Sequence, residues 1–138
     1  ALDNVILPLV YSRKSPKNVK DRAREVLAKV GMDHRLHHTP GQLSGGEQQR
    51  VTIARSLIND PPIIFADEPT GNLDSKNGIE TMKTFDKLVD EGKTIVLITH
   101  DSQVAEHANR IIAIRDGKIA SDSKFQSQKT PFNLSEKL

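Results

Sequence analysis

The sequence contains no cysteine and no tryptophan, and aromatic residues make up only 4% of its 138 residues. The absence of cysteine excludes a disulfide scaffold, a thiol nucleophile and a zinc site with cysteine ligands. Because aromatic side chains are scarce, we expect a core of Ile, Val, Leu and Ala. No apolar run reaches the roughly 18 residues needed to cross a bilayer. The sequence also lacks a signal peptide and an initial methionine, so we expect a piece of a longer protein.

Charges of the two signs are nearly balanced, with 20 Lys and Arg against 18 Asp and Glu. The net charge of +2 is too small to indicate nucleic acid, and none is expected as a partner. The N-terminal part is nevertheless locally basic. This basic cluster is either the solvated face of a helix or a surface for an acidic partner, a membrane or a phosphate backbone. Its members are Arg13, Lys14, Lys17, Lys20, Arg22, Arg24, Lys29 and Arg35.

A helix is predicted over about residues 16–30. Ser15 and Pro16 have the order of an N-cap followed by proline at the first helical position. Apolar residues then recur at intervals of three and four. The apolar run before it, residues 4–10, contains Pro8 and is therefore a poor candidate for a central strand. A polar, histidine-rich loop is expected after the helix.

The pattern of apolar residues over 63–98 predicts a strand–helix–strand unit. The continuous apolar runs 63–66 and 94–98 are typical of strands covered on both faces. A helix is predicted between them, over about 74–91. This order makes the two strands parallel neighbours and indicates an α/β fold.

An edge hairpin is predicted after the second of these strands. The apolar run 111–114 is followed by Asp116-Gly117, a favourable hairpin turn, and then by the returning strand 118–120. The segment 122–138 is polar and is interpreted as a tail.

The most informative motif is Leu43-Ser44-Gly45-Gly46-Glu47. Ser44 and Glu47 have the spacing of a capping box, which predicts a second helix. Adjacent glycines in a first helical turn are conformationally costly, but they let an anion approach the N–H groups at the positive end of the helix dipole. The alternative is an ordinary helix cap with two flexible glycines.

Ionisable residues follow the two predicted parallel strands. Asp67 and Glu68 come after the first strand, and His100 comes after the second. Because ligands bind beyond the carboxyl ends of parallel strands, these side chains could form one site. An Asp at the end of a buried strand is the pattern that holds Mg²⁺ in phosphate-handling enzymes, and the next carboxylate can act as a general base toward water. The alternative is that strand ends carry charge simply because they return to water.

Three histidines offer a separate possibility. His34, His37 and His38 have the i, i+3, i+4 spacing of ligands on one helix face, which would suit a metal ion. The alternative is a solvated loop.

Four motifs together resemble those of ABC-type ATPases, in that family's order. Residues 43–50 resemble the signature motif, 63–68 resemble Walker B with its glutamate, 71–74 resemble the D-loop, and His100 resembles the switch histidine. The opening apolar run and the D-loop are most similar to the branch that serves lipoprotein release, macrolide export and antimicrobial-peptide export.

The resemblance implies a role for each matching residue. Asp67 would hold Mg²⁺, Glu68 would polarise the attacking water, and His100 would contact the γ-phosphate of ATP. The signature would bind ATP held by an opposing subunit, and Asp74 would carry contact across the dimer. The implied nucleotide-binding residues are Leu43, Ser44, Gly45, Gly46, Glu47, Gln48 and Asp74.

The resemblance also implies an architecture and partners. We expect a P-loop NTPase-like fold with a helical subdomain over 1–42, the signature, Walker B and switch half of the core over 43–121, and the tail over 122–138. The implied partners are a second nucleotide-binding domain, joined head to tail, and a membrane permease. The implied location is cytoplasmic, peripheral on the inner face of the plasma membrane.

One departure limits the expected activity. The sequence has no G-x-x-x-x-G-K-[ST] phosphate loop; Gly92-Lys93-Thr94 imitates its ending but precedes a strand instead of a helix. We therefore expect the C-terminal part of a nucleotide-binding domain, separated from the half that carries the phosphate loop and Q-loop. By itself such a chain should hydrolyse ATP negligibly, and exposed sheet edges should favour self-association.

Two alternatives remain at the level of the sequence. A chromosome-maintenance or DNA-repair ATPase shares the signature and Walker B but places a long heptad repeat before the signature, where residues 1–42 offer one short helix. A non-catalytic partner-binding or regulatory module would fold and bind its partner without nucleotide.

Overall fold

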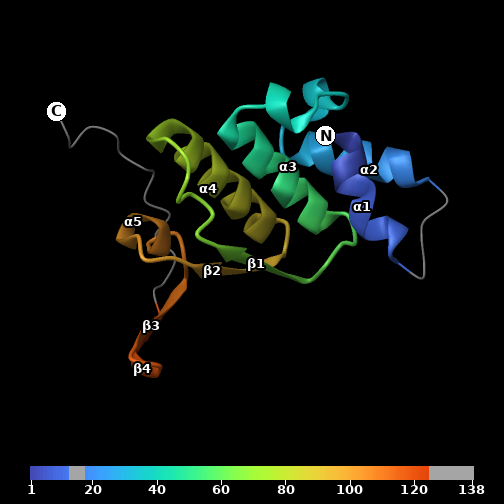
Figure 1. Ribbon diagram of the computed structural model, residues 1–138. Helices are drawn as coiled ribbons and strands as arrows, with labels where there is room; N and C mark the ends of the chain where they lie inside the picture. The colour runs from blue at the N-terminus through green and yellow to red at the C-terminus, as the bar shows by residue number, and fades with distance from the viewer. Residues whose placement is uncertain (13–17, 125–138) are drawn as a thin grey trace. The chain divides into compact units, whose positions relative to one another are not determined.

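The computed structural model describes residues 1–12 and 18–124. They belong to two compact units, residues 1–100 and residues 101–138, and the second is described as far as Lys124. The first unit contains a helical layer and a strand–helix–strand unit, and the second contains a short helix and a hairpin (Figure 1). The α/β fold class is confirmed.

The helical layer consists of α1 (Leu2–Val10), α2 (Val19–Lys29) and α3 (Gly45–Leu57), which pack against one another. The run over residues 4–10 is therefore a helix. Leu2, Val5 and Leu9 recur at helical spacing and are buried, although Pro8 removes one backbone hydrogen bond near the end of the helix. Two short 3₁₀ turns, Asp33–Arg35 and Pro40–Gln42, lie in the loop before α3.

The predicted helix over 16–30 corresponds to α2. Its apolar face is buried, as expected, and Gly31 follows the helix with a φ of 71°. Ser15 and Pro16, the predicted start, lie outside the described residues, and Asn18 occupies the N-cap position.

The strand–helix–strand unit consists of β1 (Ile63–Asp67), α4 (Ser75–Asp90) and β2 (Thr94–Ile98). β1 and β2 are parallel neighbours, with Ile63 opposite Thr94 and Asp67 opposite Ile98, which confirms the predicted pairing. Met82, Phe85 and Leu88 form the buried face of α4.

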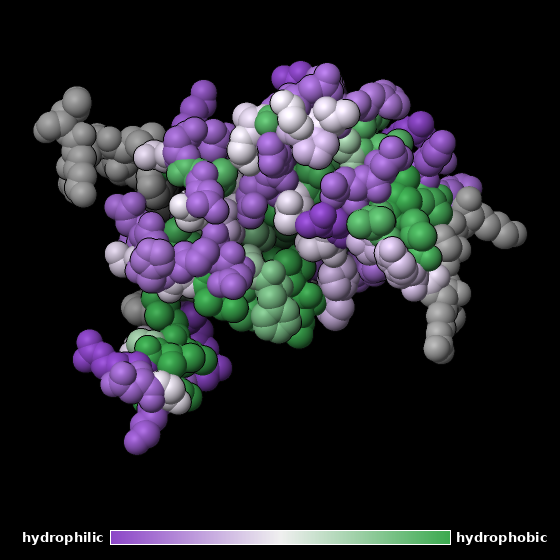
Figure 2. Space-filling view, viewed as in Figure 1, coloured by the Kyte–Doolittle hydropathy of each residue, from purple (hydrophilic) through white to green (hydrophobic). Residues whose placement is uncertain are grey.

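The prediction that both faces of these strands are covered is wrong for the described chain. Ile64 and Ala66 are buried, whereas Phe65 is 71% and Ile98 is 51% exposed on the other face. Figure 1 places α3 and α4 on one side of the two strands, and in Figure 2 hydrophobic surface gathers where the strands lie below these helices. A strand that is apolar on both faces is typical of a sheet with other elements packed on both sides. Within residues 1–12 and 18–100, other elements pack on only one face of β1 and β2.

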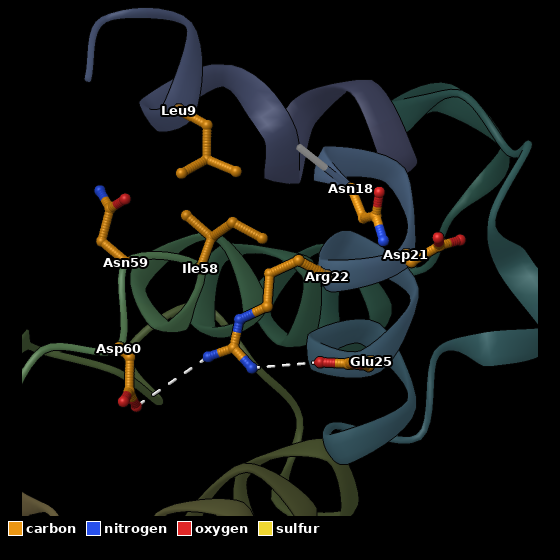
Figure 3. A pocket seen from close by; sticks show the side chains of 8 residues that line it. All are labelled: Leu9, Asn18, Asp21, Arg22, Glu25, Ile58, Asn59 and Asp60. Carbon is orange, nitrogen blue, oxygen red and sulfur yellow. Dashed lines mark hydrogen bonds and ion pairs between the residues drawn. The ribbon is translucent and has the colours of Figure 1, made fainter. Parts of the chain in front are cut away.

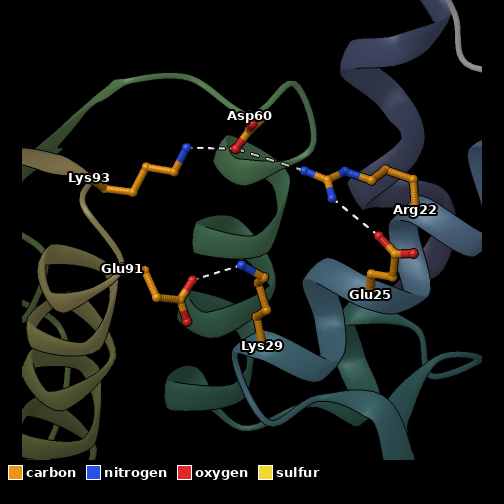
Figure 4. Close-up of polar contacts among 6 residues, drawn as sticks. All are labelled: Arg22, Glu25, Lys29, Asp60, Glu91 and Lys93. Atoms are coloured by element: carbon orange, nitrogen blue, oxygen red, sulfur yellow. Dashed lines mark hydrogen bonds and ion pairs between the residues drawn. The ribbon is translucent and has the colours of Figure 1, made fainter.

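Ion pairs tie the helical layer and the segment after α3 to the residues between α4 and β2 (Figure 4). Lys29 Nζ lies 2.7 Å from Glu91 Oε2, after α4, and Lys93 Nζ lies 2.6 Å from Asp60 Oδ1, after α3. Arg22 crosses an open groove between α2 and the segment after α3 and points toward Glu25 and Asp60 (Figure 3).

These contacts bear on the basic cluster. Four of the five members that the structure describes have an acidic partner in the first unit: Arg22, Arg24, Lys29 and Arg35, but not Lys20. Arg13, Lys14 and Lys17 lie outside the described residues. The described part of the cluster therefore favours the interpretation as a solvated, ion-paired helix face over a free surface for an acidic partner.

The second unit contains α5 (Ser102–Ala105), β3 (Arg110–Arg115) and β4 (Lys118–Lys124). β3 and β4 form the predicted antiparallel hairpin, and both turn residues, Asp116 and Gly117, have positive φ, as a tight hairpin turn requires. β4 continues to Lys124, so it enters the segment expected to be a tail.

We predict that the exposed face of β1 and β2 drives concentration-dependent self-association of the chain. Apolar sheet surface and unpaired strand edges tend to associate with the same features of a second chain. Phe65→Lys should shift the sedimentation profile toward monomer. The matched control is Tyr11→Lys, which changes an 81% exposed aromatic in the helical layer and should leave the profile unchanged. A wild-type chain that sediments as a clean monomer at high concentration would contradict the prediction.

Candidate functional site

The carboxyl ends of β1 and β2 form the first part of the site. The ladder continues one residue beyond β1, because Glu68 N donates to Ile98 O at 2.8 Å. Glu68 has a φ of 43°, a left-handed conformation that is uncommon for a residue with a Cβ and that clusters at functional positions. Asp67, the last residue of β1, is exposed.

The Glu68 carboxylate is held by residues that follow β2. Its Oε1 accepts a hydrogen bond from His100 N at 3.0 Å and lies 2.7 Å from His100 Nδ1, while Thr99 Oγ1 donates to Oε2 at 3.3 Å. The hydrogen bond with the His100 side chain is the largest cause of the lowered pKa of Glu68; burial opposes the shift, and the His100 N–H and Thr99 add to it. Glu68 is therefore ionised and, with 38% of its side chain exposed, can accept a proton from water.

Strand order thus brings Glu68 and His100 together, as the sequence suggested; their catalytic roles stay predictions. Thr99 was not predicted as part of the site. Its only signal in the sequence is its place between the second strand and His100.

The signature turn, residues 43–47, leads into α3, and a complete capping box closes the start of this helix. Ser44 N donates to Glu47 Oε2 at 2.8 Å, and Glu47 N donates to Ser44 Oγ at 3.3 Å. Arg35 Nε donates to the other carboxylate oxygen, Glu47 Oε1, at 3.0 Å. The Ser44 N–H contributes most to lowering the pKa of Glu47 from 4.5 to about 2, burial opposes the shift, and Arg35 adds to it.

The six signature residues predicted to bind nucleotide do not all face outward. Leu43 is buried, Glu47 makes the internal contacts above, and Gln48 Nε2 donates to Pro40 O and Leu43 O at 3.0 and 3.1 Å. Ser44 and Gly45 are exposed. Within the described chain, the N–H group of the exposed Gly45 has no hydrogen-bond partner and remains available to an anion, whereas Gly46 is buried.

Gly46 is required by packing between α3 and α4. A Cβ at this position would overlap the side chain of Asn77, whereas a Cβ on Gly45 would meet only Leu73 Cδ2 at 3.7 Å. The Asn77 side chain is itself fixed, because its Nδ2 donates to Asp74 Oδ2 at 2.8 Å.

Asp74 is the N-cap of α4. Its Oδ1 accepts from Asn77 N at 2.8 Å, and this bond is the largest cause of the lowered pKa of Asp74. The predicted D-loop residue therefore has a structural role in this chain. Asn77 was missed: its bond to Asp74, three residues earlier, is local, but its approach to Gly46 follows only from the way that the helix ends meet.

The predicted histidine site does not form. Only His34 lies in the 3₁₀ turn Asp33–Arg35, so the three histidines do not share a helix face, and His38 Nε2 lies 3.1 Å from Arg35 Nη1. Over residues 1–12 and 18–124, no group of three or more His, Cys, Asp or Glu is arranged to hold a metal ion. The exposed Asp67 could supply one ligand of Mg²⁺, an ion that commonly uses one or two carboxylates together with phosphate oxygens.

None of the helices within the described ranges is both long and apolar enough to pass through a membrane.

Comparison with known proteins finds that the chain is similar to ABC transporter proteins. The family model described as ABC transporter matches residues 2–71. The macrolide export ATP-binding/permease protein MacB of Chlorobium luteolum is 56% identical over 123 residues, which cover 89% of this chain and 18% of the relative. An uncharacterized ABC transporter ATP-binding protein of Thermotoga maritima is 54% identical over 119 residues, covering 86% of this chain and 51% of the relative.

Solved structures agree in fold. One is a dimeric ATP-binding cassette in a post-hydrolysis state, bound to ADP and Pi, which superposes on this chain with a TM-score of 0.74 at 45% identity. The superposed region covers 91% of this chain and 56% of the cassette's chain. The chain thus spans about half of that cassette and about a fifth of the MacB relative. These relatives favour a transporter cassette over the chromosome-maintenance alternative.

The two glycines of the turn should respond differently to the same substitution. Gly46→Ala should lower the free energy of unfolding by about 1–3 kcal/mol, because the new Cβ meets a fixed Asn77 side chain. Gly45→Ala, the matched control, should change it by less than about 1 kcal/mol, because the new Cβ makes only an ordinary van der Waals contact with Leu73 Cδ2 at 3.7 Å and alanine favours the helix. Urea denaturation measures both, and equal effects would contradict the packing account.

Proposed function

Because the chain belongs to the ABC transporter family, we propose that it carries the water-activating and partner-facing part of an ATP-binding cassette that couples ATP hydrolysis to export. The observation that carries the proposal is the Glu68 carboxylate, held at 2.7 Å from His100 Nδ1 at the joined ends of β1 and β2. The macrolide-export relatives support export as the process that the complete protein drives.

Glu68 is the proposed general base. Its carboxylate is ionised, its oxygens are oriented by His100 and Thr99, and part of it faces solvent. In this position it can orient a water molecule and take its proton as the water attacks phosphorus. His100, whose side chain is 87% exposed beside Glu68, is the proposed contact with the terminal phosphate.

Asp67 is the proposed Mg²⁺ ligand, directly or through water. When bound with ATP, Mg²⁺ would neutralise charge that develops on the phosphate oxygens. The exposed position of Asp67 beside Glu68 suits this role, and its side chain can hold the ion only jointly with the nucleotide.

The signature turn is the proposed contact with ATP bound to a second cassette. Ser44 and Gly45 face outward, and the Gly45 N–H group at the start of α3 suits a γ-phosphate. Asp74 and its turn would lie at the same dimer interface. We further propose that residues 1–42 contact a membrane permease, which would place the complete protein on the inner face of the plasma membrane.

The proposal predicts how ATP turnover depends on Glu68. The purified chain alone should hydrolyse ATP negligibly, since none of its 138 residues forms a phosphate loop. Supplied with a phosphate-loop segment from a related cassette, it should gain turnover that Glu68→Gln lowers by about 10²- to 10⁴-fold. Glu80→Gln, which changes an exposed glutamate of α4, is the matched control and should leave turnover unchanged.

Two results would overturn the assignment. One is Glu68-dependent turnover by the chain alone, and the other is turnover in the supplemented chain that survives Glu68→Gln.

A further inference from the structure

The signature turn is held by contacts that begin outside the motif. Arg35 Nε donates to Glu47 Oε1 at 3.0 Å, and the second oxygen of the same carboxylate accepts the Ser44 N–H at 2.8 Å. One carboxylate therefore joins a residue of the preceding loop to the residue at which α3 begins.

This connection is better protected than an ordinary surface ion pair. The side chains of Arg35 and Glu47 are 37% and 14% exposed, and the guanidinium is also fixed through Nη1, 3.1 Å from His38 Nε2. A planar guanidinium held at two points keeps its direction, and low exposure reduces screening by salt.

The turn depends on such support because of its composition. Gly45 and Gly46 have little intrinsic preference for one backbone conformation. Asn77 restrains Gly46 from the side of α4, but Gly45 is exposed and meets only Leu73. The conformation of Ser44, set by its bond to Glu47, therefore decides where the Gly45 N–H points.

We propose that Arg35 is a positioning residue for the phosphate-binding turn, acting through Glu47 to fix Ser44 and so aim the Gly45 N–H group at the anion. This inference rests on the proposed function of the turn. Arg35 acts through orientation and makes no contact with the phosphate itself.

A purely electrostatic role makes a different prediction. If Arg35 only attracted the anion by its charge, Arg35→Ala would weaken anion binding and Glu47→Gln would strengthen it, since the first removes a positive and the second a negative charge. If Arg35 acts through Glu47, both substitutions break the same connection and change binding in the same direction. Glutamine can still cap Ser44 but cannot form the ion pair.

The first test is amide hydrogen exchange in the full 138-residue chain. Exchange at Ser44 N–H should accelerate by about three- to tenfold in Arg35→Ala, the effect expected for loss of a charge-assisted contact. Arg24→Ala, which breaks the 2.8 Å pair with Asp21 in the same helical layer, is the matched control and should leave this exchange unchanged. Unchanged exchange in Arg35→Ala would overturn the positioning role.

The second test is a titration with inorganic phosphate, followed by the amide resonances of Gly45 and Gly46. Arg35→Ala and Glu47→Gln should each weaken phosphate binding by about three- to tenfold. The double variant should bind phosphate about as well as whichever single variant binds it less tightly, because both changes break the same connection. Tighter binding by Glu47→Gln would overturn the inference in favour of simple electrostatics.

The two tests separate this inference from the proposed function. If the wild-type resonances do not respond to phosphate, the proposed anion site is contradicted. The exchange of Ser44 then decides by itself only whether Arg35 fixes the turn through Glu47.

Discussion

The parallel pairing of β1 and β2 is the constraint on which the site depends. It brings two segments separated by a whole helix to one edge, where Glu68 N continues the ladder to Ile98 O at 2.8 Å. Only this register places the Glu68 carboxylate within reach of His100 and Thr99. Burial of Ile64 and Ala66 under the helices holds the pair together, and the opposite apolar face stays exposed.

The second part of the site depends on the meeting of two helix ends. α3 and α4 approach closely where Gly46 lies against Asn77, and Asn77 in turn holds Asp74. Each end is capped by its own side chain, so the residues that the family motif marks for binding also stabilise the helices on which they stand. Stability and function are therefore coupled at this turn, and a substitution here tests both unless a matched control separates them.

Local signals in the sequence were sufficient for much of this arrangement. The capping box at Ser44, the strand–helix–strand order and the hairpin at Asp116-Gly117 each rest on neighbouring residues. The helix α1 was not predicted, because a short apolar run with Pro8 does not distinguish helix from strand. The contact of Arg35 with Glu47 and the close approach of Asn77 to Gly46 were not predictable, since they link residues that only tertiary packing brings together.

In the proposed function, this chain offers its signature turn to ATP held by another cassette. Fluorescence anisotropy of the labelled chain, mixed with the Thermotoga maritima relative, tests it directly. Addition of ATP should increase association. Ser44→Asp should abolish the increase, because aspartate still caps the helix but repels a phosphate. Association that is the same with and without ATP would contradict the claim.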